Sequence, residues 1–218
     1  MALVFPRPIL ECGLRSGTLS LAENVAMSPS GKGGFANLTQ VNDPVWLFAC
    51  ETHTLRASSR AEWGAWKASL QGGLRSFLGY DTRRRAPLAY AGARGPSDIG
   101  AGWGGTANVV QLGAAGALTL SGVPPQYRFS PGDRIGIEQG APLRRGYYEV
   151  VEPAAADGAG TAVVTVAPVL HRALFSPGAV ARLWRPVCEL VMDWTSWRDE
   201  NGSVPALGAI SFSAWQRI

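Results

Sequence analysis

Glycine and proline interrupt this sequence at short intervals, and their spacing constrains the fold more than any other feature. The chain contains 27 glycines and 15 prolines among its 218 residues. Because glycine weakens a helix and proline breaks it, helices longer than a few turns are not expected outside one window. The rest of the sequence consists of short apolar runs between turn-forming residues, which predicts a mainly β protein.

Residues 59–77 form that exceptional window. Ser59 and Glu62 match the S-x-x-E capping box. Apolar residues at spacings of three and four follow this box, and burying each of their side chains stabilises the fold by about 1.5–3 kcal/mol. This gain exceeds the helix destabilisation of about 1 kcal/mol expected from each of Gly72 and Gly73. We therefore predict one α-helix over residues 59–77, with its apolar stripe formed by Trp63, Trp66, Leu70, Leu74 and Phe77.

Strand-like runs lie on both sides of this window. Residues 45–55, VWLFACETHTL, predict a strand buried at one end. A glycine-rich passage from about Thr82 is interpreted as either an ordered loop or a linker. Five short strands separated by turns follow it and predict a small β-barrel or sandwich: ALTLSGV, DRIGIEQG, GYYEVVEP, TAVVTVAPVL and AVARLWRP. The tail, with CELVMDW, a turn at RDENG and AISFSAWQRI, predicts a hairpin.

This order predicts two domains. A terminal hairpin has too few strands to be stable alone, so it must pack on the N-terminal part of the chain. We predict a discontinuous domain of residues 1–81 plus 186–218, with a small β-barrel domain of residues 82–185 inserted into it.

Composition excludes several classes of protein. Only 17% of the residues are charged and 46% are hydrophobic, which argues against disorder. Cys12, Cys50 and Cys188 are odd in number and lack a CxxC spacing, so neither a disulfide framework nor a metal site is expected. The N-terminal sequence has no signal-peptide pattern, and no apolar run reaches the length of a membrane span.

No residue pattern predicts catalysis or a cofactor. His53 and His171 are the only histidines, and neither lies in a catalytic motif. Gly100, Gly102 and Gly105 match G-x-G-x-x-G, but a dinucleotide site needs a strand before the motif and a helix after it, and neither is expected here. We predict a protein that is not an enzyme, with no catalytic, cofactor-binding or metal-binding residues.

Arginine clusters are the most unusual charged feature. All basic residues except Lys32 and Lys67 are arginine, and they cluster at Arg83, Arg84 and Arg85 and again at Arg144 and Arg145. Three interpretations remain open: a solvated loop, a nucleic-acid surface, or ion pairs within the chain or across a subunit interface. The absence of interleaved aromatic residues argues against sequence-specific nucleic-acid binding.

The order of several segments resembles the distal tail proteins of long-tailed bacteriophages. These segments are NVAMSPSGKGG, DPVWLFACETHTL, AEWGAWKASLQGGLRSFLGYD, RRAPLAY, FSPGDRIGI and GYYEVVEPAAADGAGTAVVTVAPVL. The resemblance covers much of the chain, with the tryptophan-rich segment and the P-G-D-x-I-x-I run as its most suggestive parts.

The resemblance implies a β-sandwich belt domain with one helix, from which an inserted β-barrel, OB-like or similar, projects. Six copies would close into a ring at the end of the tail, assembled in the host cytoplasm and then part of the virion. The ring would join the tail tube protein to the hub of the tip or baseplate, with the tape-measure protein as a further candidate partner, and DNA would pass through its lumen. Arg83, Arg84, Arg85, Arg144 and Arg145 are then interface candidates.

Carbohydrate binding is the main alternative function. A β-barrel inserted in a tail protein could attach to a host glycan, and exposed aromatic side chains stack on sugar rings. Tyr90, Trp103 and Tyr148 are the candidate contacts. Both interpretations predict a protein without membrane insertion.

Overall fold

The computed structural model describes residues 3–29, 36–201 and 207–217 and divides the chain into two compact units. The barrel unit holds Leu78–Glu189 and the N-terminal segment up to Ile9. The sheet unit holds Leu10–Phe77 and Leu190–Arg217. Both units are mainly β, and the described residues contain one α-helix, so the predicted fold class is confirmed.

The boundaries of the units lie close to, but not at, the predicted domain limits. The chain passes between the units after Phe77 and after Glu189, within strands β7 (Phe77–Gly79) and β16 (Cys188–Met192). The N-terminal segment, predicted to belong with residues 10–81, groups instead with the barrel unit. Its backbone is held there by the Ile9 amide, which donates to the Leu78 carbonyl at 2.9 Å.

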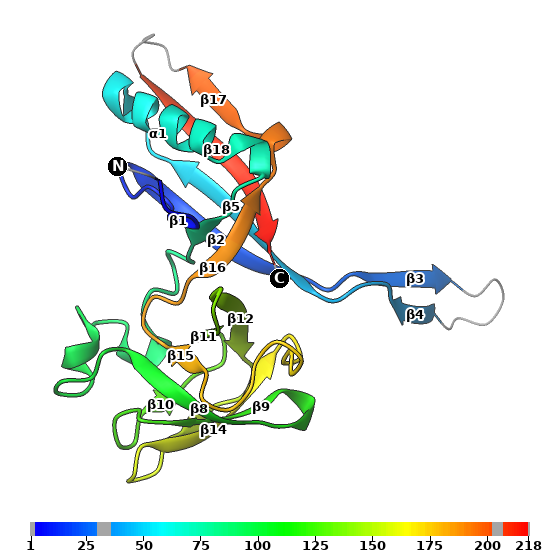
Figure 1. Cartoon of the computed structure of the whole chain (residues 1–218), viewed down its shortest axis with the longest axis vertical. Helices are drawn as coiled ribbons and strands as arrows, with labels where there is room; N and C mark the ends of the chain where they lie inside the picture. Colours follow the sequence, from blue (N-terminus) through cyan, green and yellow to red (C-terminus); the bar gives the residue numbers. More distant parts are fainter. Residues whose placement is uncertain (1–2, 30–35, 202–206, 218) are drawn as a thin grey trace. The chain divides into compact units, whose positions relative to one another are not determined.

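A twisted antiparallel sheet forms the sheet unit (Figure 1). Its strands are ordered β16-β18-β5-β2, with β6 and β17 also paired to β18. Side chains of β5 and β18 alternate between buried and more exposed positions along each strand, as the alternating sequence requires. The strand bounds are β2 (Leu14–Ala22), β5 (Val45–Thr52), β6 (Leu55–Arg56), β17 (Arg198–Asn201) and β18 (Leu207–Gln216).

Helix α1 (Ala57–Ser69) covers the buried face of this sheet (Figure 1). It occupies the place that a second sheet would take in the predicted sandwich. Phe212 of β18 lies at the centre of the contact, and its ring centroid is 5.5–6.2 Å from those of five aromatic neighbours: Phe48, Trp63, Trp66, Phe77 and Trp197. The predicted tryptophan stripe is thus confirmed at Trp63 and Trp66, which are both fully buried.

The predicted helix ends, at 59 and 77, were wrong. Strand β6 runs directly into α1, so Arg56 is the N-cap residue and no side chain caps the helix. Ser59 lies inside the first turn, where it cannot act as the first residue of a capping box.

At the other end, the helix stops before three consecutive residues with positive φ, the first of which is Gln71 at 51°. Gly72 and Gly73 adopt positive φ angles of 66° and 93° within the short 3-10 turn η1 (Gln71–Gly73). Leu74 is consequently 79% exposed, while Phe77 is buried in strand β7. The helix has ended before Leu74 and Phe77. The apolar residue at position 77 belongs to the strand that follows and does not extend the helical stripe.

Six antiparallel strands close the barrel, in the order β11-β12-β14-β9-β8-β15. Alternate side chains fill its interior, including Leu118, Leu120, Ile135, Ile137 and Val164. Five of the strands match the predicted runs: β9 (Ala117–Ser121), β11 (Arg134–Gln139), β12 (Arg144–Val150), β14 (Thr161–Ala167) and β15 (Val180–Arg182).

The sixth barrel strand, β8 (Thr106–Leu112), lies in the passage interpreted as a loop or linker. It pairs with β9 on one side and with β15 on the other, so it closes the barrel. The glycines that precede it obscured its strand pattern. The barrel unit also contains the shorter elements β1 (Arg7–Pro8), β10 (Arg128–Phe129), β13 (Ala154–Ala155), η2 (Leu88–Tyr90), η3 (Pro96–Asp98) and η4 (Ala114–Gly116).

The RDENG sequence, predicted as a turn, is extended up to Asn201. Arg198–Asn201 of the RDENG sequence is strand β17, and it pairs with residues 208–211 of β18. Asp199 is fixed in this strand by Arg60 of α1, whose Nη2 lies 2.7 Å from the Asp199 Oδ1. The CELVMDW run forms β16, followed by the 3-10 turn η5 (Trp194–Ser196).

Candidate functional site

The three consecutive arginines of the barrel unit have different surroundings. Arg83 is 67% exposed in its side chain and lies 3.6 Å from the buried Asp81 carboxylate. Arg84 approaches Gly132, where a Cβ atom would lie 3.5 Å from its guanidinium. Arg85 lies over the Tyr80 ring, with its Cζ 5.7 Å from the ring centroid. Each of the three arginines therefore has a different neighbour: Arg83 a carboxylate, Arg84 a glycine and Arg85 an aromatic ring.

Arg83 and Arg85 share a pocket with two arginines that are distant in the sequence. Arg94 and Arg185 line the same pocket, which has a volume of about 450 Å³. Arg185 lies over the same Tyr80 ring at 4.2 Å, and its backbone amide donates to the Arg85 carbonyl at 2.7 Å. No carboxylate lines this pocket. Sequence inspection found Arg83 and Arg85 but gave no signal for Arg94 or Arg185, which only the fold brings to them.

The two arginines of the second predicted cluster also differ in their surroundings. Arg145 is mostly buried and lies 3.4 Å from Glu138 and 3.2 Å from Glu189. Arg182 reaches the same Glu138 at 3.0 Å. Arg144, at the start of β12, is exposed and lines a different hollow of the barrel unit. Arg145 thus has partners within its own chain, whereas Arg144 faces outward.

The predicted glycan-contact aromatics are more buried than a shallow sugar site requires. Tyr148 is 1% exposed in the barrel core. Tyr90 and Trp103 are half-buried and pack against Tyr127, with ring centroids 5.0 and 5.2 Å away. The Trp103 indole also donates to the Thr106 carbonyl at 2.7 Å. These side chains have structural contacts, and burial removes Tyr148 from the rings that a sugar could reach.

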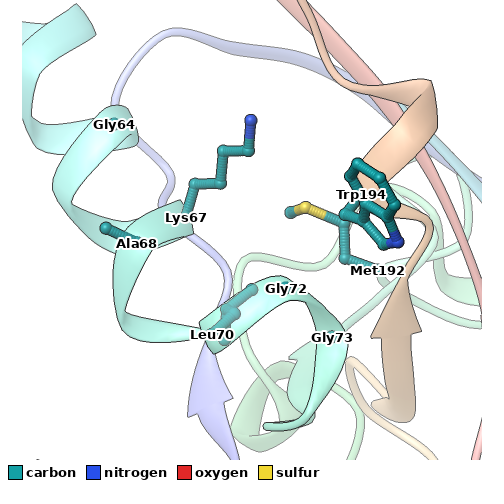
Figure 2. A pocket seen from close by; sticks show the side chains of 8 residues that line it. All are labelled: Gly64, Lys67, Ala68, Leu70, Gly72, Gly73, Met192 and Trp194. Carbon is teal, nitrogen blue, oxygen red and sulfur yellow. The ribbon is translucent and has the colours of Figure 1, made fainter.

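An exposed tryptophan lies in the sheet unit instead. Trp194 is 63% exposed and borders a hollow of about 320 Å³ (Figure 2). Lys67 of α1 and Met192 of β16 face the same hollow, and Gly72 leaves it open because nothing lies within 4 Å of where its Cβ would be. No local sequence pattern separates Trp194 from the buried tryptophans, since it follows a strand closely.

A two-stranded hairpin extends β2 and β5 and has no other strand partner among the described residues (Figure 1). It consists of β3 (Val25–Pro29) and β4 (Ala36–Gln40). In its register Met27 lies opposite Leu38, and these side chains are 66% and 67% exposed. Val25 lies on the same face and is also exposed. Residues 30–34 of the SPSGKGG run, which include Lys32, lie outside the described residues.

The opposite face of the hairpin is polar or small. Ala26 pairs with Thr39, and Ser28 pairs with Asn37. The hairpin is therefore amphipathic, with its apolar face in water in the isolated chain. An isolated two-stranded hairpin is at best marginally stable in water, so this one gains from a partner that covers its apolar face.

Potential catalytic groups are dispersed. His53 is exposed at the end of β5, and His171 is half-buried in the barrel unit. Burial raises the pKa of the Cys50 and Cys188 thiols, which keeps them protonated at neutral pH. Gly100, Gly102 and Gly105 lie between η3 and β8, without the strand and helix that a dinucleotide site needs. Across residues 3–29, 36–201 and 207–217, no group of three or more metal-ligating side chains is gathered.

Comparison with protein-family models and with curated proteins finds no match to this chain. Among the described residues, no helix has both the length and the apolar character needed to cross a membrane. Three features of the surface are candidates for function: the amphipathic hairpin, the arginine pocket and the hollow beside Trp194.

Proposed function

We propose that this protein is a structural ring adaptor at the distal end of a long-tailed phage tail or a phage-like particle. The amphipathic β3–β4 hairpin is the observation that carries the proposal. Its apolar face, formed by Val25, Met27 and Leu38, is exposed in the single chain. In the proposed ring, a neighbouring copy covers this face.

A closed ring would explain why the hairpin carries an exposed apolar face. In a cyclic assembly each copy presents two different patches, one that reaches forward and one that receives the neighbour. The receiving patch proposed here is the exposed face of the sheet, where Trp215 lies between Leu47 and Val191 on the adjacent strands. Trp215 and Leu47 are 45% and 44% exposed, so both offer apolar area to a partner.

The division of the chain into two units is also consistent with an adaptor. The sheet unit would build the ring, and the barrel unit would be carried by it. The proposed partners are the tail tube protein on one side, the hub of the tip or baseplate on the other, and the tape-measure protein in the lumen. DNA would pass through the ring without being read, and the adaptor would perform no reaction.

Native mass measured over a range of protein concentrations tests the ring. We expect a discrete assembly of about six subunits. The variant Met27→Asp/Leu38→Asp should remain monomeric, because it places charge on the apolar face that the neighbour buries. Ser28→Asp/Asn37→Asp adds the same charge to the opposite face and should still assemble. A wild-type monomer at every concentration, or an assembly indifferent to Met27→Asp/Leu38→Asp, would contradict the proposal.

Carbohydrate binding is a second candidate function, and the exposed Trp194 is the observation that favours it. The ring of Trp194 borders an open hollow with a lysine beside it, an arrangement suited to stacking on a sugar (Figure 2). Quenching of tryptophan fluorescence by a host glycan, abolished by Trp194→Ala, would support this function. No response to host-surface glycans would remove it.

A further inference from the structure

The arginine pocket of the barrel unit has a charge that ring formation does not explain. Arg83, Arg85, Arg94 and Arg185 line it together with Trp184, and no acidic residue does. Like charges at close range repel, and the fold gathers these four from separate parts of the chain. Such a gathering of one charge in a concave site attracts ions of the opposite sign.

Several arginines outside the pocket are paired with carboxylates. Arg60, Arg134, Arg145 and Arg182 each form a salt bridge with a carboxylate of the same chain. Among the residues that the structure describes, neither Arg85 nor Arg94 forms one. Arg83 has Asp81 beneath it, but that carboxylate is 1% exposed and does not line the pocket. Among the described residues, the guanidiniums of Arg85 and Arg94 therefore have no carboxylate at salt-bridge distance.

The backbone holds two of these arginines close together. Arg185 adopts a φ of 48°, in the left-handed region that non-glycine residues seldom occupy. In this conformation its amide reaches the Arg85 carbonyl, and both guanidiniums lie over Tyr80. Burial lowers the pKa of Arg185, so its positive charge is held at some cost. Strained backbone of this kind is concentrated at binding sites.

We propose that this pocket binds a phosphate-bearing ligand, with Arg83, Arg85 and Arg94 as the recognition residues. A phosphate group carries close to two negative charges and offers three oxygens, so it can accept from several guanidinium forks at once. A carboxylate carries one negative charge, so it could offset the charge of Arg85 or of Arg94 but not of both. The volume of about 450 Å³ is within the range of small-ligand sites, and Trp184 provides an aromatic wall for the group that carries the phosphate.

Calorimetric titration of the full-length protein with tripolyphosphate at low ionic strength tests the site. We expect saturable binding with one ligand per chain, weakened by added salt because the site is open to solvent. Arg85→Gln/Arg94→Gln should weaken binding at least about tenfold, since charge-assisted hydrogen bonds are lost. Arg94→Gln alone, at an exposed side chain, should weaken it by a smaller factor. Arg128→Gln removes an exposed arginine outside the pocket and should leave the affinity unchanged.

Two further ligands define the chemistry. Tricarballylate, a tricarboxylate, should bind at least about tenfold more weakly than tripolyphosphate. A short single-stranded oligonucleotide distinguishes the source: tighter binding that Arg85→Gln/Arg94→Gln weakens indicates a phosphodiester polymer, and weaker binding indicates a free or terminal phosphate. The proposal is overturned by equal affinity for tricarballylate, by an absence of tripolyphosphate binding, or by equal affinity in wild type and Arg85→Gln/Arg94→Gln. The native mass of the protein is measured separately, so failure of the ring would leave this result intact.

Discussion

The backbone around Gly160 leaves no room for a side chain at this position. It lies in the turn before β14 at a φ of +75°, and a Cβ atom there would lie 2.2 Å from the Val123 carbonyl oxygen. Gly158, two residues earlier in the same turn, has no atom within 4 Å of its corresponding position. Asp157 holds the turn by accepting the amides of Ala159 and Thr161 at 2.9 and 2.8 Å.

Substitution of these two glycines should therefore have unequal effects. Gly160→Ala should lower the free energy of unfolding by about 2–4 kcal/mol, because alanine is strained at positive φ and its Cβ would contact backbone that cannot move aside easily. Gly158→Ala should change it by less than about 1 kcal/mol. Urea unfolding of both variants provides the measurement. Equal losses would show that the turn tolerates the Cβ by shifting.

Sequence reasoning at the residue scale identified charge clusters but could not assign partners. Arg83 and Arg85 were recognised as candidates, yet whether an arginine has a carboxylate beside it depends on the fold. Arg145 meets Glu189, 44 residues away, and Arg85 meets Arg185. Sequence alone did not single out Trp194, because the exposure that separates it from the core tryptophans has no local signal in so apolar a sequence.

At the scale of elements, β18 is the strand on which the sheet unit depends. It pairs with β5 along one edge and with β16 and β17 along the other. Its even-numbered residues from Gly208 to Gln216 are buried, whereas its odd-numbered residues lie on the opposite face and are less buried, with Trp215 exposed. One strand therefore presents the core of the unit on one face and the proposed receiving patch on the other.

Truncating one side chain from each face of β18 separates these roles. Phe212→Ala should destabilise the protein by about 3–5 kcal/mol, because it leaves a cavity among five aromatic rings. Trp215→Ala, three residues along on the exposed face, should cost about 1 kcal/mol or less in the monomer. Thermal unfolding at low protein concentration measures both. A comparable loss for Trp215→Ala would show that this ring belongs to the core.

The elements themselves were largely predictable, and the exceptions share a physical cause. Alternation identified β5 and five barrel strands, because side chains that face a core must be apolar at every second position. The helix was extended wrongly beyond Ser69, since Leu74 and Phe77 continue the helical spacing by coincidence. Strand β8 was missed because its pattern follows glycines that are typical of loops, and only the closed barrel requires a strand there.

At the scale of the whole molecule, the barrel unit has a core of its own. All members of its buried cluster lie between Ala107 and Leu183. A closed barrel has no exposed sheet edge and needs no neighbour to complete its hydrogen bonding. The discontinuous arrangement could be inferred from sequence because the C-terminal strands are too few to fold alone. The positions at which the chain passes from one unit to the other could not be inferred, because both lie within continuous strands.

A fragment spanning residues 78–189 should fold independently. We expect dispersed amide resonances in its NMR spectrum and a cooperative thermal transition. A fragment of residues 78–179 lacks β15, which joins β8 to β11, and should not fold because its barrel cannot close. If both fragments were equally disordered, the barrel unit would depend on the sheet unit for its stability.

The backbone hydrogen bond between Arg185 and Arg85 brings the incoming and outgoing chain of the barrel unit together at 2.7 Å. The stretch from Arg85 to Arg185, which holds the whole barrel, therefore begins and ends at one place, and a host fold tolerates such an insertion much as it tolerates an enlarged loop. Recombination could therefore exchange the whole barrel for another module in a single event, with the sheet unit left unchanged. In the proposed adaptor, such an exchange would replace the module that the ring carries and leave the ring-forming sheet unit in place.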